Sequence, residues 1–489
     1  MLPEKTILDM TLNGLSRHFF LICAVAGMSL LVSISTVDRA ITWLALSIVA
    51  ASLLPIFTSY YLQSPMATPF FEAICLFYGV SFGLTVFMIE LAWSDSTSII
   101  MYSRIYIDRI LVDVFILVLV GLVTLMITYY FARFIFVRHL QRFHVRSAAN
   151  VEHLKYLYWP LIALNLIYLY IPAMHSWPSV GQFLGPVGLL GFSGLYLEWR
   201  RGRVRHLEAG IALILFITLK IYAIVQTLFI TEVILTTGFI LFVLWRERQF
   251  KTIILPVVVI AIFIASYSAV TGVRNAVPPG FGRLDRVFKE TLRLVQSPIS
   301  RELTTAIPSW DHGDGFGSPK FAPAIPLVHR ISHIWIFHYV YQKVPDQVPY
   351  WSGHSYKPIL TSIIPRFLYP DKPTETIGNE FGRRFGIILE NQTNTSINLP
   401  WITELLANFG KTGVVWGMTL IGIFLAFLDR FFNSPGGKDL EFVIGLTLIF
   451  PLVYPESNFS VMTGSMPLLF LSLYAYFGGG TWLFGRFTR

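Results

Sequence analysis

Residues 109–132 read RILVDVFILVLVGLVTLMITYYFA, and residues 133–146, RFIFVRHLQRFHVR, follow at once. The first stretch is predominantly apolar and has the length, roughly 20 residues, that an α-helix needs to cross the hydrocarbon core of a bilayer. The second holds four arginines and no acid, and short basic connections of this kind favour the cytoplasmic side of a membrane. Together they predict a membrane-spanning helix that ends in the cytoplasm.

The composition of the whole chain points to the same class. Of 489 residues, 54% are hydrophobic and 13% charged, whereas globular domains carry about 25% charged residues. The formal net charge is +9. Two further basic connections, 200–205 and 246–251, contain four and three Lys or Arg with the single acid Glu247. The positive net charge is therefore explained by membrane topology, which argues against a nucleic-acid partner.

Apolar runs along the chain predict an all-α polytopic membrane protein of about 12 transmembrane helices. With twelve spans, the basic connections all lie on the same side of the membrane. Basic connections favour the cytoplasm, so both termini are cytoplasmic as well. The predicted organisation is a nine-helix bundle (1–270), one large periplasmic loop (271–409) and three C-terminal helices (410–489). The expected spans are 19–37, 40–62, 68–92, 109–132, 154–172, 181–199, 208–227, 231–245, 252–270, 410–429, 440–456 and 463–484.

The loop of about 139 residues between the ninth and tenth spans is far longer than the 2–8 residues usual between packed helices. Loops of this length commonly carry function. Within it, residues 281–296 place apolar and basic side chains on different helical faces, which predicts an amphipathic helix on the membrane surface. A more apolar run, 325–342, is expected to pack back onto the bundle.

Cations are frequent in this loop, with nine Arg and five Lys against five Asp and six Glu. They form either a solvated surface or a site for phosphate, which Arg binds through forked hydrogen bonds. Arg274 follows the ninth span closely and is expected at the headgroup level. The segments IPRFLYPDKP (364–373) and GNEFGRRFG (378–386) gather further cations, namely Arg366, Lys372, Arg383 and Arg384.

The segment LPWITELLANFGKTG (399–413) leads into the tenth span and places Glu404 and Asn408 on one helical face. A carboxylate near the membrane surface is costly unless it has a partner or a function, although a helix-start carboxylate favoured by the macrodipole is the alternative. Lys220 and Asp113 within spans are likewise either functional or a structural pair. His329 and His333 form an HxxxH pair without a third ligand, so no metal site is predicted.

Two patterns carry a resemblance to a known family. PR-x5-KP with Gly378 and Phe381, followed by E-x3-NFG-x2-G, resembles the bacterial O-antigen and exopolysaccharide repeat-unit polymerases of the Wzy type, which are related to the O-antigen ligases. The first pattern comprises Pro365, Arg366, Lys372 and Pro373, and the second Glu404, Asn408, Phe409, Gly410 and Gly413. The likeness covers the large loop and the tenth span.

This resemblance implies a glycosyltransferase-C-like helical bundle in the bacterial inner membrane. Such an enzyme joins undecaprenyl-pyrophosphate-linked oligosaccharides at the periplasmic face, without a nucleotide sugar, metal or other cofactor. Besides these lipid-linked substrates and the bilayer, a chain-length-regulating membrane protein is a candidate partner.

Residue roles follow from the charge changes of such a reaction. Fixed cations stabilise the charge that develops on the leaving pyrophosphate, and a carboxylate can accept the proton of the attacking sugar hydroxyl. The expected base is Glu404, with Glu380 and His329 as substitutes, and the expected catalytic cations are Arg274 and Arg366. Further substrate-binding candidates are Lys372, Arg383, Arg384, Asn408, Arg330 and Lys220.

Two other functions stay open at this point. An O-antigen ligase performs the same chemistry with a lipid A core acceptor, and the sequence does not separate it from a polymerase. A lipid-linked oligosaccharide flippase belongs to a different class, but transporters tend to have paired repeats. The single large loop favours an enzyme.

Overall fold

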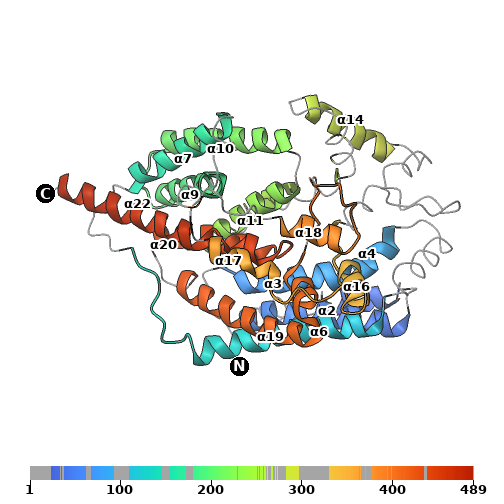
Figure 1. Ribbon diagram of the computed structural model, residues 1–489. Helices are drawn as coiled ribbons and strands as arrows, with labels where there is room; N and C mark the ends of the chain where they lie inside the picture. The colour runs from blue at the N-terminus through green and yellow to red at the C-terminus, as the bar shows by residue number, and fades with distance from the viewer. Residues whose placement is uncertain are drawn as a thin grey trace, which may run out of the picture.

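The computed structural model (Figure 1) describes residues 24–33, 38–61, 68–92, 110–145, 154–171, 180–227, 230–249, 282–296, 330–362, 376–393, 399–433 and 438–487, together with isolated positions between them. Every regular element in these residues is helical, and they contain no β-strand. The chain therefore has the all-α architecture that its apolar runs predict.

One group of helices packs α2, α3, α6 and α19 together, and these lie side by side in the lower part of Figure 1. Ser52 on α2 lies against Gly79, and the Ala45 carbonyl lies against Gly83, so α2 runs antiparallel to the third predicted span. The members are α2 (Arg39–Tyr61), α6 (Val112–Ile135), α19 (Trp401–Phe432), and the third span built from α3 (Phe70–Tyr78), the π-helical segment η1 (Gly79–Leu84) and α4 (Thr85–Ala92).

Within this group α6 and α19 run parallel. Val414 lies against Gly121, and Gly422 faces the carbonyl of Leu125, where an added Cβ would come within 2.8 Å of its oxygen. Further along both helices, the Tyr129 hydroxyl donates a hydrogen bond to Asp429. The two helices thus advance in the same direction from one end of the bundle to the other.

A second group joins α7 (Leu154–Tyr170), α9 (Val180–Arg200), α10 (His206–Thr227), α11 (Ile230–Arg246), α20 (Asp439–Ile449) and α22 (Met466–Phe487). The pair α7 and α9 is antiparallel, since the Asn165 amide donates to the Leu184 carbonyl and Tyr158 packs against Gly194. At the start of α7, the Tyr476 hydroxyl of α22 donates to the Leu157 carbonyl. Figure 1 shows α7, α9 and α10 together, apart from α2, α6 and α19.

Five helices among the described residues are long and apolar enough to cross a membrane. They are Arg39–Ser59, Phe70–Met88, Val112–Ile135, Trp401–Phe432 and Phe459–Trp482. An all-α chain with several such helices is consistent with a membrane protein. The count of twelve spans and the periplasmic position of the loop stay predictions.

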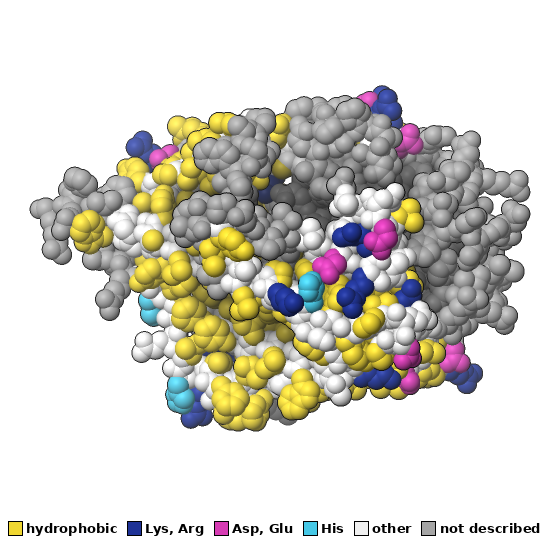
Figure 2. Space-filling model, in the orientation of Figure 1, with side chains coloured by type: hydrophobic (Ala, Val, Ile, Leu, Met, Phe, Trp, Pro, Cys, Tyr) yellow, Lys and Arg dark blue, Asp and Glu magenta, His cyan; other side chains and the backbone are white. Residues whose placement is uncertain are grey.

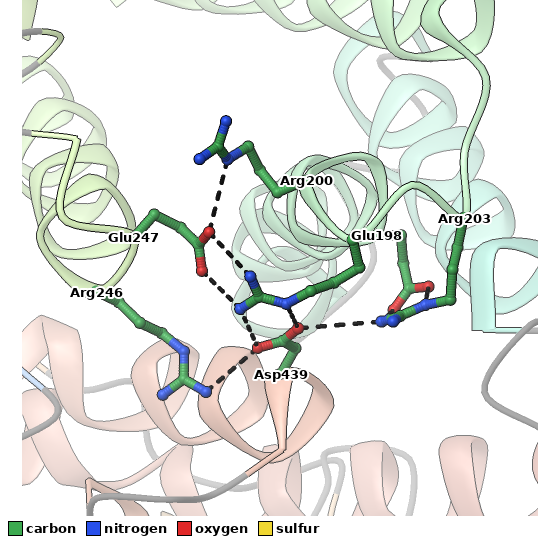
Figure 3. A network of polar contacts seen from close by, with 7 residues as sticks. Glu198, Arg200, Arg203, Arg246, Glu247 and Asp439 are labelled. Atoms are coloured by element: carbon green, nitrogen blue, oxygen red, sulfur yellow. Dashed lines mark hydrogen bonds and ion pairs between the residues drawn. The ribbon is translucent and has the colours of Figure 1, made fainter.

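The two basic connections at 200–205 and 246–251 meet in one ionic network with the start of α20 (Figure 3). Arg201 binds Glu247 at 2.8 Å and Asp439 at 2.9 Å, and Arg246 reaches the same aspartate at 3.2 Å. Burial acts to raise the pKa of Asp439, but Arg201 and Arg246 outweigh it and lower the pKa. The buried Glu198 pairs in turn with Arg203 at 2.6 Å. These arginines therefore tie helix ends together as well as carrying charge.

The third basic connection, which follows α6, lies at this same end. The Phe143 N–H donates to the Phe431 carbonyl at the end of α19, and His144 contacts Glu441 near the start of α20. Connections far apart in the sequence thus gather beside α20, as a shared membrane side would require.

Both helices predicted inside the large loop are present. The amphipathic helix α14 (Gly282–Gln296) exposes 68% of Phe288 and 43% of Leu292, as expected for a helix whose apolar face meets a lipid surface. In contrast, α16 (Ile334–Lys343) buries Ile334, Phe337 and Val340 against α19, α6 and η1. The prediction that this second run packs onto the bundle is confirmed.

Candidate functional site

The residues predicted for the site fall into two sets. Arg274, Arg366, Lys372 and His329 lie outside the described residues. The others are described: Glu404 and Asn408 on the first turns of α19, Glu380, Arg383 and Arg384 on α18 (Ile377–Arg384), Arg330 just before α16, and Lys220 on α10. The structure brings Glu380 and Arg384 of α18 and Glu404 and Asn408 of α19 around one short segment, 349–355.

That segment meets α19 at an interruption of the helix. Gly410 has φ 71° and ψ −161°, a combination that is essentially restricted to glycine and does not continue an α-helix. Just before it, the carbonyls of Ala407 and Asn408 accept hydrogen bonds from the N–H groups of Trp351 and Ser352, each at 3.1 Å. The break thus supplies acceptors to which the segment attaches.

Glu404 is completely buried, with 0% of its surface exposed. Its Oε1 accepts a hydrogen bond from the Ser355 hydroxyl at 2.5 Å, and its Oε2 accepts one from the Phe459 N–H at 2.7 Å. The nearby Tyr356 is enclosed in the same way. Burial, and next the charge of Glu404, raise the pKa of its hydroxyl well above the ordinary value. The carboxylate links α19 to two separate parts of the chain.

Asn408, one turn further along, adds a second set of contacts. Its Oδ1 accepts from the Gly353 N–H at 2.9 Å, and its Nδ2 donates to the Ser355 hydroxyl at 2.9 Å. Ser355 thereby bridges Glu404 and Asn408. This bridging explains why the two residues stand four apart on one helical face.

His354, between Gly353 and Ser355, was not predicted from the sequence. Its Nε2 lies 3.2 Å from the Glu380 carboxylate on α18. The side chains are 42% and 35% exposed, so this pair, unlike Glu404, is open to a ligand. Figure 2 shows acidic, basic and histidine side chains gathered on a largely hydrophobic surface, over the area where Figure 1 places α18.

The two arginines of α18 are held differently. Arg384 donates to the Pro349 carbonyl at 2.8 Å, and its guanidinium lies 5.6 Å from the centre of the Trp351 ring. The Nε of Arg383 is buried and has no hydrogen-bond partner among the described residues. Arg384 therefore helps to fix the 349–355 segment, while Arg383 keeps an unpaired donor.

Arg330 pairs with the buried Glu456 and stands close to His333, whose side chain is also buried. His333 Nε2 has no hydrogen-bond partner within the described part of the chain. Burial, and next the charge of Arg330, lower the pKa of His333 from 6.5 to about 3. The imidazole is therefore neutral at physiological pH.

This shift makes a prediction about acid stability. The folded pKa lies below the unfolded one, so the contribution of His333 is complete above pH 6.5 and falls as the pH drops toward 3. At pH 5 the loss is about 2 kcal/mol. His333→Gln should therefore lose less stability than wild type between pH 7.5 and pH 5, measured by thermal unfolding in detergent, while the exposed control His139→Gln should match wild type. Equal losses in wild type and His333→Gln would contradict the assignment.

Lys220 and Asp113 do not form the pair that was one alternative from the sequence. Asp113, near the start of α6, accepts a hydrogen bond from the Tyr341 hydroxyl at 3.3 Å, and Lys220 lies on α10 in the other helix group. Tyr341 is also in contact with Lys411, whose Nζ lies 4.5 Å from its ring centre. Asp113 thus belongs to the surroundings of α16 and α19.

A buried polar network at the far end of α19 was also missed. Asp429 accepts hydrogen bonds from Tyr129, Arg133 and Asn433, at 2.7, 2.8 and 2.7 Å. Twenty-five residues separate it from Glu404 along α19, which corresponds to roughly 37 Å of helix. The network joins the bundle at the opposite end and is not part of the candidate site.

Metal ligands do not gather in the described part of the chain, which contains no group of three or more His, Cys, Asp or Glu side chains able to hold an ion. The polar side chains around residues 349–355 include carboxylates, an amide, a guanidinium group and the imidazole of His354.

Part of the chain is similar to a known protein family. Residues 325–474 match the family model of a domain of unknown function, DUF8712. The matched stretch runs from the residues before α16 into α22 and contains the whole 349–355 segment with α18 and α19. No curated protein and no solved structure matches the chain.

Proposed function

We propose that this chain is an inner-membrane glycosyltransferase that polymerises undecaprenyl-pyrophosphate-linked oligosaccharide repeat units at the periplasmic face. One observation carries the proposal. The two sequence patterns that resemble the Wzy-type polymerases lie apart in the chain, yet both meet residues 349–355. The Phe381 ring of the first pattern lies beside the Trp351 ring, and Glu404 and Asn408 of the second bond Ser355 and Gly353.

The helix directions support the twelve-span topology on which this proposal depends. Parallel packing of α6 and α19 fits their places as the fourth and tenth spans, since even-numbered spans cross in the same direction. Antiparallel packing of α7 and α9 fits the fifth and sixth spans. With the basic connections in the cytoplasm, residues 349–355 and the start of α19 lie toward the periplasm, in a glycosyltransferase-C-like bundle.

The proposed reaction needs cations at the leaving group. When the growing chain leaves its lipid carrier, negative charge develops on the pyrophosphate, and preorganised guanidinium and ammonium groups stabilise it. We assign this role to Arg274, Arg366, Lys372 and Arg383. The buried Nε of Arg383, which has no partner among the described residues, suits a phosphate oxygen as acceptor.

The reaction also needs an acceptor for the proton of the attacking sugar hydroxyl. Glu404 is the residue expected from the sequence, with Glu380 and His329 as substitutes. His354, which is paired with Glu380, is a further candidate. A single displacement of this kind inverts the anomeric centre.

The pyrophosphate assignment is tested with Arg366→Lys and a matched control. Lysine keeps the positive charge but loses the planar fork of donors, so we expect roughly tenfold or greater loss of polymer at normal expression. Arg286→Ala on the exposed face of α14 should change polymer yield little. The readout is the ladder of polysaccharide chain lengths in cells. Equal small effects of both substitutions would mean that these cations form a solvated surface and do not bind pyrophosphate.

The ladder, together with the location of the lipid-linked intermediates, separates the rival functions. A polymerase deletion leaves single repeat units attached to lipid A core, a ligase deletion leaves long polymer on the lipid carrier, and a flippase deletion leaves repeat units on the cytoplasmic side. Only the first pattern supports the proposal. A chain-length-regulating partner would show as a changed distribution of lengths rather than loss of polymer.

A further inference from the structure

We infer that Glu404 and Asn408 are positioning residues, which hold residues 353–355 so that His354, paired with Glu380, accepts the proton from the acceptor hydroxyl. This inference rests on the proposed function and changes the role expected for Glu404. It assigns proton transfer to a residue outside both recognised sequence patterns.

The surroundings of Glu404 suit a structural attachment. Both carboxylate oxygens already accept hydrogen bonds, from Ser355 and from the Phe459 N–H, and none of the residue is exposed. A general base has to come within hydrogen-bond reach of the substrate proton. Because Glu404 is fully buried between Ser355 and the start of α21 (Phe459–Thr463), a sugar hydroxyl would reach its carboxylate only after neighbouring groups moved aside.

The attachments converge on the residues that flank His354. Gly353 donates its N–H to Asn408, and the Ser355 hydroxyl bonds both Asn408 and Glu404. Gly353 also has a positive φ of 85°, a conformation that glycine adopts without strain. Because both neighbours of His354 are held, the backbone that carries its side chain is held as well, and the contact with Glu380 orients the ring.

His354 has the features of a proton acceptor. Its Nε2 faces the Glu380 carboxylate at 3.2 Å, which favours the tautomer with the proton on Nε2 and leaves the lone pair on Nδ1. Nδ1 has no hydrogen-bond partner among the described residues, and the side chain is 42% exposed. A carboxylate behind an imidazole also stabilises the cation formed when the ring takes a proton.

The inferred reaction is a single displacement at the anomeric carbon. The acceptor hydroxyl oxygen bonds to the anomeric carbon of the donor sugar while its O–H proton passes to Nδ1 of His354. The bond between the anomeric carbon and the pyrophosphate oxygen breaks, and the leaving pyrophosphate keeps the electron pair. His354 then releases the proton to solvent.

Substitutions at Glu404 give opposite results for the two roles. Glutamine can accept from Phe459 with its carbonyl and donate to Ser355 with its amide, so Glu404→Gln should retain chain extension within about threefold of wild type. A general base would lose about 10²-fold or more in kcat. Glu404→Ala should lose at least about tenfold, because it releases Ser355, and Ser355→Ala, a smaller change, should shift kcat in the same direction.

A second measurement does not depend on activity. Diethyl pyrocarbonate modifies exposed imidazoles, and mass spectrometry of the detergent-purified full chain reports the rate at His354. We expect a severalfold change in that rate in Glu404→Ala and Ser355→Ala, and the wild-type rate in Glu404→Gln. The exposed His139, at the other end of the bundle, serves as the internal control.

The outcomes distinguish a failure of the proposed function from a failure of the role inferred for Glu404. If purified wild type fails to extend lipid-pyrophosphate oligosaccharide, the proposed function fails, while the modification rates still decide whether Glu404 positions His354. A loss of about 10²-fold in Glu404→Gln, with normal His354 modification, would overturn the inference and return the base role to Glu404. Unchanged modification in both Ser355→Ala and Glu404→Ala would overturn it as well.

Discussion

His354→Gln is expected to slow chain extension by about 10²-fold or more while the protein stays folded. Glutamine retains an N–H that can donate to Glu380, so the contact between the 349–355 segment and α18 is kept. It has no lone pair basic enough to take a proton from a sugar hydroxyl. The measurement is kcat with lipid-pyrophosphate oligosaccharide in detergent, alongside a thermal unfolding midpoint.

The control for this prediction is a histidine far from the site. His139 follows α6, is exposed and accepts a hydrogen bond from Arg138, so His139→Gln should extend chains at the wild-type rate. Near-normal kcat in His354→Gln would remove the imidazole from proton transfer. A large fall in the unfolding midpoint would instead mark His354 as a structural residue.

The helical elements were largely predictable because their signal is local. Each apolar run predicted between residues 40 and 245, and between 410 and 484, contains a helix in the structure, since a run of apolar residues of that length can satisfy its backbone in lipid only as a helix. Pairing between helices was not predictable. Neither the parallel packing of α6 on α19 nor the ionic network around Asp439 has a local sequence signal, because each depends on residues hundreds of positions apart.

In the candidate site too, local features were predictable and contacts between distant residues were not. The spacing of Glu404 and Asn408 correctly predicted a shared helical face, and the break at Gly410 falls where the tenth span was expected to begin. The burial of Glu404 and the presence of His354 were not predicted. A single histidine among Trp351, Ser352 and Gly353 carries no pattern of its own, and its significance appears only when α18 brings Glu380 beside it.

Gly410→Ala is expected to lower both the stability and the activity of the protein. At φ 71° and ψ −161° a Cβ strains the backbone, and here it would also lie 2.6 Å from the Tyr350 hydroxyl oxygen. We expect about 2–4 kcal/mol less stability and at least about tenfold less chain extension. The activity falls because Ala407 and Asn408 would no longer present their carbonyls to residues 351 and 352.

Gly478→Ala provides the matched control, since Gly478 lies in α22 and an added Cβ there meets no atom within 4 Å. Alanine favours a helix over glycine by up to about 1 kcal/mol, so this variant should be as stable as wild type or slightly more stable, with unchanged activity. Thermal unfolding and kcat of the two variants are compared in the same detergent. Wild-type stability and activity in Gly410→Ala would mean that the interruption of α19 does not hold the 349–355 segment, because a continuous helix would then serve the site equally well.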